Sequence, residues 1–70
     1  MYSKEIGIRL MQLRGDRSQE EMGNTIGVSR SAWAMYEQGK RIPRDAIKVK
    51  IAKHFKTTVQ SIFFDSKGDI

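Results

Sequence analysis

The sequence predicts an all-α fold, a compact bundle of five short helices, and three observations lead to this prediction. Apolar residues recur every three or four positions in several stretches, which is the spacing of one helix face. Glycine closes three of these stretches and serine opens two of them, as is typical of helix ends. No stretch longer than a few residues alternates apolar and polar side chains, so a β-sheet is not indicated.

The first two helices are predicted on either side of Gly15. Before this glycine, apolar residues have the spacing of a helix face. After it, Ser18 and Glu21 have the spacing of a capping box, in which a hydroxyl and a carboxylate each satisfy one free backbone amide. The second helix therefore begins after Ser18, runs to about Ile26 and ends at Gly27.

Three more helices are predicted along the rest of the chain. Ser29 is a second candidate N-cap, and Gly39 closes the helix that follows it. Pro43 costs little near the start of the next helix, because the first amides of a helix have no partner within it. The predicted ranges are about 30–38, 44–55 and 59–64.

The turn between the second and third helices is the most informative feature. It has about three residues and contains a glycine, which forces the sharp angle of a helix-turn-helix. In the third helix, Trp33 and Tyr36 are three residues apart and can both face inward. The residues left outward are mostly small or uncharged, which suits entry into a groove; they are Arg30, Ser31, Ala34, Met35 and Gln38.

The charge of the chain is concentrated in one segment. Lys and Arg number 13 against 8 Asp and Glu, a net charge of +5. Seven basic residues and one acidic residue lie between Lys40 and Lys56, so this segment carries +6 and the remainder −1. Such a block fits either a surface that binds a polyanion or a solvated helix face. The lysines of the fourth helix point in several directions and are expected to contribute only a long-range field.

Composition argues against several classes of protein. The chain has no cysteine and one histidine, His54, which we expect to be a bystander, so we expect no metal site and no cofactor. It has no 18-residue apolar run and no apolar signal-peptide core, so we expect a soluble, cytoplasmic, nucleoid-associated protein without membrane contact. Neither a Ser-His-Asp set nor a phosphate-binding glycine loop is present, so we do not expect an enzyme.

With these elements in place, the sequence resembles the Cro/repressor-type helix-turn-helix proteins of bacteria and phages, also called the xenobiotic-response-element (XRE) family. The resemblance extends over about 6–64, in the order and spacing of the family. The residues that carry it are Ser18-Gln19-Glu20-Glu21-Met22-Gly23, Ile26-Gly27-Val28-Ser29-Arg30-Ser31, Tyr36-Glu37-Gln38-Gly39, Pro43 and Ile51-Ala52. It implies a five-helix, lambda-repressor-like DNA-binding domain over 1–64, followed by a short polar tail over 65–70.

The resemblance also implies roles for individual residues, with a recognition helix at about Ser29–Gln38 in the major groove of double-stranded DNA. The positions that read bases are Arg30, Ser31, Ala34 and Met35. The positions that bind phosphate are Gln19, Ser29, Gln38, Lys40, Arg41 and Arg44, with Gln38 supporting Gln19 or a phosphate. Arg14 and Glu37 match a buried ion pair between the first and third helices, and Trp33 and Tyr36 belong to the core.

The chain departs from the family pattern at several positions. Arg17 occupies a position that is usually apolar, and Trp33 one that is usually aliphatic. Gly23 replaces the usual alanine, which permits a close backbone approach but lowers helix propensity by about 1 kcal/mol.

These expectations lead to a transcriptional regulator, a repressor rather than an activator, which binds a palindromic operator as a homodimer. An apolar contact through Phe63, Phe64 and Ile70 would hold the dimer; alternatively, Ile62 and Phe63 only close the core of a monomer. Since no second domain is evident, regulation is expected from concentration, dimerisation or a partner protein. The alternative is an antitoxin-like or antirepressor-controlled protein-interaction module with the same fold.

Overall fold

The computed structural model describes residues 3–64 and confirms the all-α prediction. No strand occurs in this range, and the elements are α1 (Ser3–Arg14), α2 (Gln19–Ile26), α3 (Arg30–Gln38), α4 (Asp45–His54) and η1 (Gln60–Phe64). The helix bounds agree with the predicted ones to within about one residue. The fifth element differs in kind, because it is a single turn of π-helix. The predicted tail, 65–70, lies outside the described residues.

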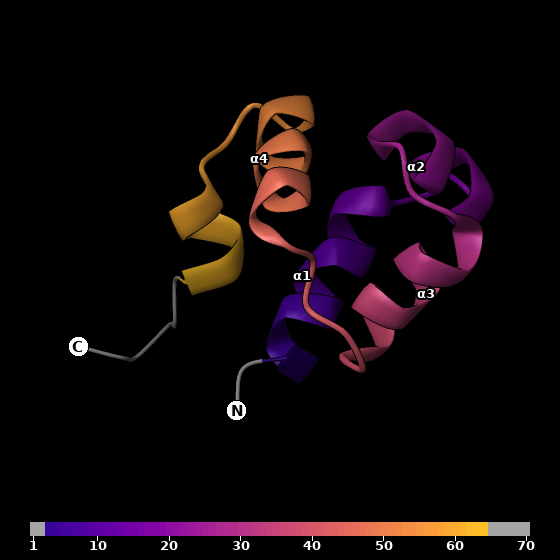
Figure 1. Ribbon diagram of the computed structural model, residues 1–70, viewed down its shortest axis with the longest axis horizontal. Helices are drawn as coiled ribbons and strands as arrows, with labels where there is room; N and C mark the ends of the chain where they lie inside the picture. The colour runs from indigo at the N-terminus through magenta and orange to yellow at the C-terminus, as the bar shows by residue number, and fades with distance from the viewer. Residues whose placement is uncertain (1–2, 65–70) are drawn as a thin grey trace.

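The helices pack around α1, which lies in the middle of the molecule (Figure 1). Helix α3 packs against both α1 and α2, while α2 also contacts α4, and η1 packs against α1. In Figure 1, α2 and α3 lie on one side of α1, and α4 and η1 lie on the other. None of the helices in the described part of the chain is long and apolar enough to cross a membrane.

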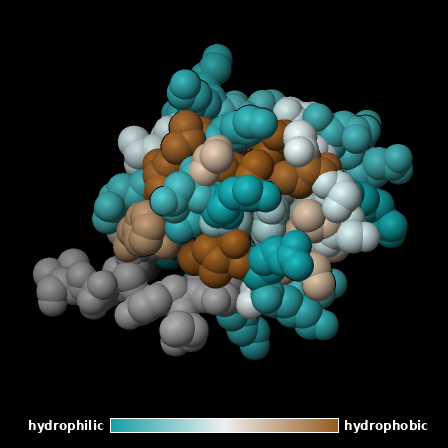
Figure 2. Space-filling model, in the orientation of Figure 1, coloured by the Kyte–Doolittle hydropathy of each residue, from teal (hydrophilic) through white to brown (hydrophobic). Residues whose placement is uncertain are grey.

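One apolar core lies between the helices, and every helix contributes to it. Trp33 is fully buried at its centre, and its ring meets that of Tyr36 edge to face, with centroids 6.1 Å apart. The prediction that these two aromatic residues belong to the core is therefore confirmed. The other buried apolar residues are Ile6, Leu10, Met22, Ile26, Ile51, Ala52, Ile62 and Phe63. On the surface, hydrophobic residues show between hydrophilic ones (Figure 2).

The helix ends form as the sequence predicts. The amide of Glu21 donates to the hydroxyl of Ser18 (3.0 Å), and the amide of Ser18 donates to the carboxylate of Glu21 (3.1 Å), which completes the capping box. The hydroxyl of Ser29 accepts a hydrogen bond from the amide of Ala32 at 3.0 Å. Gly27 then turns the chain with φ of 96°, a left-handed conformation that glycine adopts without steric penalty.

Two glycines allow backbone segments to approach each other. A Cβ atom at Gly7 of α1 would lie 2.2 Å from the carbonyl oxygen of Glu37 in α3. A Cβ atom at Gly23 of α2 would lie 2.8 Å from the carbonyl oxygen of Val28 in the turn. The close approach expected at Gly23 is confirmed, whereas the tighter one at Gly7 was not predicted from the sequence.

The last turn, η1, closes one end of the core. Ile62 and Phe63 are buried, so both side chains pack into the core. Phe63 therefore has no surface to offer a second copy of the chain, and the expectation of a dimer contact at this residue is wrong. Phe64 is 58% exposed, and Ile70 lies outside the described residues.

Candidate nucleic-acid interface

The exposed face of α3 carries all four side chains predicted to read bases. Arg30, Ser31 and Met35 are exposed, and Ala34 is half-buried beside them. The acidic residue of this helix, Glu37, is on the buried face, so one cation and no carboxylate are presented outward. The caps at both ends and the buried aromatic pair keep α3 short and fixed in orientation.

Glu37 is a buried carboxylate that accepts hydrogen bonds from three side chains. The Nε atom of Arg14 lies 2.6 Å from its Oε2 atom, and Nη2 of Arg14 lies 3.1 Å from its Oε1 atom. The predicted buried ion pair between the first and third helices is therefore confirmed. Two further donors were not predicted: the indole Nε1 of Trp33, and Nε2 of Gln19 at 3.0 Å from Oε1.

These donors decide the charge of Glu37. Burial alone would raise the pKa of its carboxyl group, because the interior disfavours a charge. Hydrogen bonds from Arg14, Gln19 and Trp33, together with the charge of Arg14, outweigh this effect and hold the pKa below its ordinary value. The same contact raises the pKa of Arg14. Glu37 is therefore ionised at neutral pH and ties α1, α2 and α3 together.

The pKa of Glu37 predicts an acid-dependent loss of stability. Because this pKa is lower in the folded chain, the carboxylate stabilises the fold at pH values above its ordinary pKa, and that contribution is lost as the pH falls through the folded pKa. We expect the difference in free energy of unfolding between the unaltered chain and Glu37→Gln to shrink below about pH 4. Urea unfolding followed by the fluorescence of Trp33 measures it, and an equal difference at pH 7 and pH 3 would contradict the assignment.

The side chains predicted to bind phosphate come from the start of α2, from both ends of α3 and from the segment that follows it. Gln19 is half-buried at the start of α2, and its side chain donates to Glu37. The sequence had indicated Gln38 as a support for either Gln19 or a phosphate. The hydroxyl of Ser29 accepts from a backbone amide and keeps its own proton to donate. The others are exposed at the end of α3 and in the segment that leads to α4: Gln38, Lys40, Arg41 and Arg44.

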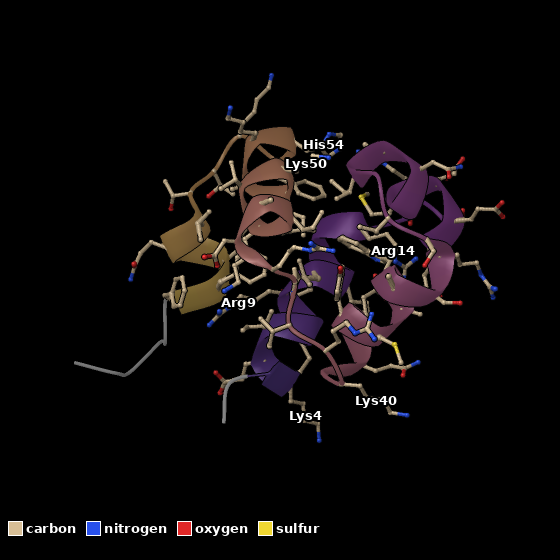
Figure 3. All side chains as sticks on the ribbon, viewed as in Figure 1. Lys4, Arg9, Arg14, Lys40, Lys50 and His54 are labelled. Atoms are coloured by element: carbon tan, nitrogen blue, oxygen red, sulfur yellow. The ribbon has the colours of Figure 1, made fainter. Side chains whose placement is uncertain are left out.

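The basic block divides into two groups in space. Lys40 lies near the end of α3, whereas Lys50 and His54 lie at the other end of the molecule, close to α2 (Figure 3). Lys48 is half-buried; its Nζ atom lies 3.7 Å from Oδ1 of Asp45 and 5.0 Å from the ring centroid of Phe64. The prediction that the lysines of the fourth helix point in several directions is therefore confirmed.

Lys50 and His54 of α4 both have structural surroundings outside their own helix. A Cβ atom at Gly27 would lie 3.5 Å from Nζ of Lys50, which places this ammonium group by the C-terminal end of α2, where the helix dipole favours a positive charge. His54 receives an interaction that the sequence did not predict, because its Nε2 atom lies 3.1 Å from Nη1 of Arg17. No cluster in the described part of the chain has enough His, Asp or Glu to hold a metal ion.

Comparison with known proteins places this geometry in a family. The helix-turn-helix domain family matches residues 5–60. The chain is 31% identical over 70 residues to the cryptic phage CTXphi transcriptional repressor RstR of Vibrio cholerae. The aligned region covers all of this chain and 61% of that protein. It is 32% identical over 57 residues to the uncharacterized HTH-type transcriptional regulator YgzD of Bacillus subtilis (strain 168). That aligned region covers 81% of this chain and 86% of the regulator.

No solved structure matches the chain significantly. The chain spans less than two thirds of the length of the Vibrio repressor. The family assignment depends instead on the domain match over residues 5–60 and on the Bacillus regulator, which the chain covers almost completely. The chain therefore belongs to the Cro/repressor-type helix-turn-helix family of DNA-binding regulators.

Proposed function

We propose that this chain is a sequence-specific transcriptional regulator that binds double-stranded DNA and acts as a repressor by occupying its operator. The observation that carries the proposal is the exposed face of α3, which offers one arginine, small or uncharged side chains and no carboxylate. The relatives named as a transcriptional repressor and a transcriptional regulator support it. We assign the DNA-binding domain to 1–64.

In this proposal, α3 lies in the major groove and Arg30 carries most of the direct readout. Its guanidinium group is exposed and matches the paired acceptors of guanine, the commonest specific contact in the major groove. A cation in the first turn of a helix opposes the helix dipole, so its position has no structural benefit. Ser31, Ala34 and Met35 add polar and apolar contacts to neighbouring bases.

The side chains around this face bind the DNA backbone and fix the depth and angle of α3. Phosphate contacts orient a protein on the duplex but carry no sequence information directly. The residues assigned to this role are Gln19, Ser29, Gln38, Lys40, Arg41 and Arg44. The cations among them contribute most of the salt dependence of binding, because each phosphate that is neutralised releases counterions.

Arg30 and Lys40 are expected to behave differently when replaced by alanine. Arg30→Ala should weaken binding to a preferred duplex by about 1–3 kcal/mol and relax the preference at one base pair. Lys40→Ala should weaken binding to all duplexes alike and reduce the salt slope by about 0.9. Fluorescence anisotropy with matched and mismatched duplexes over a range of salt concentrations measures both effects. Equal losses on every sequence for both variants would show that Arg30 does not read bases.

We also propose that the chain binds a palindromic operator as a homodimer, with half-sites one helical turn apart. Of the apolar residues first considered for the contact, Phe64 is the one that is exposed in the described part of the chain. Phe64→Ser is expected to weaken dimer formation on operator DNA and to leave the core intact. Sedimentation of the chain, free and on DNA, measures this; a monomer in both states would contradict the proposal.

A further inference from the structure

The side-chain amide of Gln19 is fixed in orientation by a buried charge. Its Nε2 atom donates to Oε1 of Glu37 at 3.0 Å, and the side chain of Glu37 is only 2% exposed. A carboxylate accepts hydrogen bonds and cannot donate them when ionised. The reverse orientation would bring the amide oxygen of Gln19 against a carboxylate oxygen. The nitrogen of Gln19 therefore faces Glu37, and the amide oxygen faces away from it.

Glu37 cannot turn to follow Gln19, because its carboxylate is held from two other sides. Arg14 donates to both of its oxygen atoms, at 2.6 and 3.1 Å, and the indole of Trp33 donates to Oε2. Arg14 also donates from Nη1 to the carbonyl oxygen of Arg17 at 2.6 Å, which holds the loop immediately before the N-cap of α2. The carboxylate of Glu37 on α3 thus holds the side chain of Gln19 directly and the start of α2 through Arg14.

An amide nitrogen has two N–H groups, and Glu37 occupies only one of them. The second N–H is the donor that Gln19 retains for another acceptor. Glu20 and Glu21 lie in the first turn of the same helix, so two negative charges repel a phosphate there. A phosphate contact at this helix end therefore depends on a neutral donor, such as the amide of Gln19, being correctly oriented. Gln19 is the residue of α2 assigned to the DNA backbone, whereas Glu37 belongs to the recognition helix.

We propose that Glu37 is a positioning residue for DNA binding: it sets the amide of Gln19 so that one N–H points to a phosphate oxygen of the duplex. The inference rests on the proposed function. It adds that the contact between Gln19 of α2 and the DNA phosphate depends on a buried carboxylate of α3. The contact then fixes the register of the recognition helix, because Glu37 belongs to that helix and its carboxylate is held by Arg14 and Trp33.

A double-mutant cycle on Gln19 and Glu37 tests the proposal, with a duplex of about 20 base pairs as the probe at low salt. Glu37→Gln should reverse the amide of Gln19 and present its oxygen to the phosphate, so that affinity falls roughly 3- to 10-fold. In a Gln19→Met background the same substitution should leave affinity unchanged within about 2-fold. The salt slope should not change in any of these variants, because the contact is neutral.

Trp33→Phe is the matched control, because it removes one donor from Glu37 but keeps the bond from Gln19. At a temperature at which the variant is folded, it should lower DNA affinity less than Glu37→Gln does, because Arg14 still holds both oxygen atoms of the carboxylate. Equal losses from Glu37→Gln in both backgrounds would overturn the proposal, since a merely structural residue would act without Gln19. If the unaltered chain binds no duplex, the proposed function itself fails; if it binds and the cycle is additive, only this inference fails.

A second measurement uses the unaltered chain, in case Glu37→Gln does not fold. The two Nε2 protons of Gln19 give separate signals in a nitrogen–proton correlation spectrum, and their absence from the Gln19→Met spectrum assigns them. Addition of the duplex should shift the proton that faces outward and leave the one bonded to Glu37 nearly unchanged. Binding that shifts neither proton, or that shifts both equally, would overturn the proposal.

Discussion

Arg14→Met is expected to lower the free energy of unfolding by about 3 kcal/mol, at the lower end of the range for a broken buried ion pair. The side chain of Glu37 is 2% exposed, so without Arg14 its charge is left with only the neutral donors of Gln19 and Trp33. The side chain of Arg14 is 20% exposed, and water entering its place reduces the loss. For a domain of this size, which is stable by about 5–10 kcal/mol, the loss is a large fraction of the total.

The partner substitution provides the control for this prediction. In the Arg14→Met background, Glu37→Gln should restore part of the stability, because it removes the uncompensated charge and keeps an acceptor for Trp33. Urea unfolding at neutral pH, followed by the fluorescence of Trp33, gives both values. A loss below about 1 kcal/mol for Arg14→Met would mean that the pair behaves like an exposed one.

Gly7→Ala is the second large effect expected, a loss of about 1–3 kcal/mol in spite of the better helix propensity of alanine. The added Cβ would lie 2.2 Å from the carbonyl oxygen of Glu37 and 3.0 Å from that of Tyr36, so α1 and α3 must move apart. Backbone atoms cannot turn aside as a flexible side chain would, so the strain spreads to the contact between the helices.

Ile8→Ala is the matched control for Gly7→Ala, because Ile8 is the next residue of α1 and is 48% exposed. Substitutions at such positions usually change stability by less than about 0.5 kcal/mol. Thermal and urea unfolding of the two variants should therefore separate clearly. A Gly7→Ala variant as stable as the unaltered chain would show that α1 and α3 are not in contact at this position.

Most of the fold follows from local features that a sequence displays. The hydroxyls of Ser18 and Ser29 lie within three residues of the amides they accept, so the starts of α2 and α3 were predictable without tertiary information. Gly27 marks the end of α2 because glycine adopts the left-handed conformation that the turn requires. The π-helical form of η1 was not predictable, because the residues that form it have the spacing of an ordinary helix turn.

The site divides in the same way. The outward face of α3 follows from helical spacing, and the partnership of Arg14 with Glu37 followed from the family resemblance. The bond from Trp33 to Glu37 joins residues four apart on one helix, so their spacing is a sequence signal for it. The contacts from Gln19 to Glu37 and from Arg17 to His54 depend on how helices and loops far apart in the sequence pack together, which spacing along the chain does not encode.

The measurement that tests the central claim most directly is a selection of bound duplexes from a random DNA pool at near-physiological salt. The account predicts a recovered motif with a guanine at a fixed position, which Arg30→Ala relaxes, and a palindrome with half-sites about one helical turn apart. Binding that enriches no sequence and only weakens with salt would contradict it. The cations around α3 would then form a general polyanion surface, and α3 would not be a recognition helix.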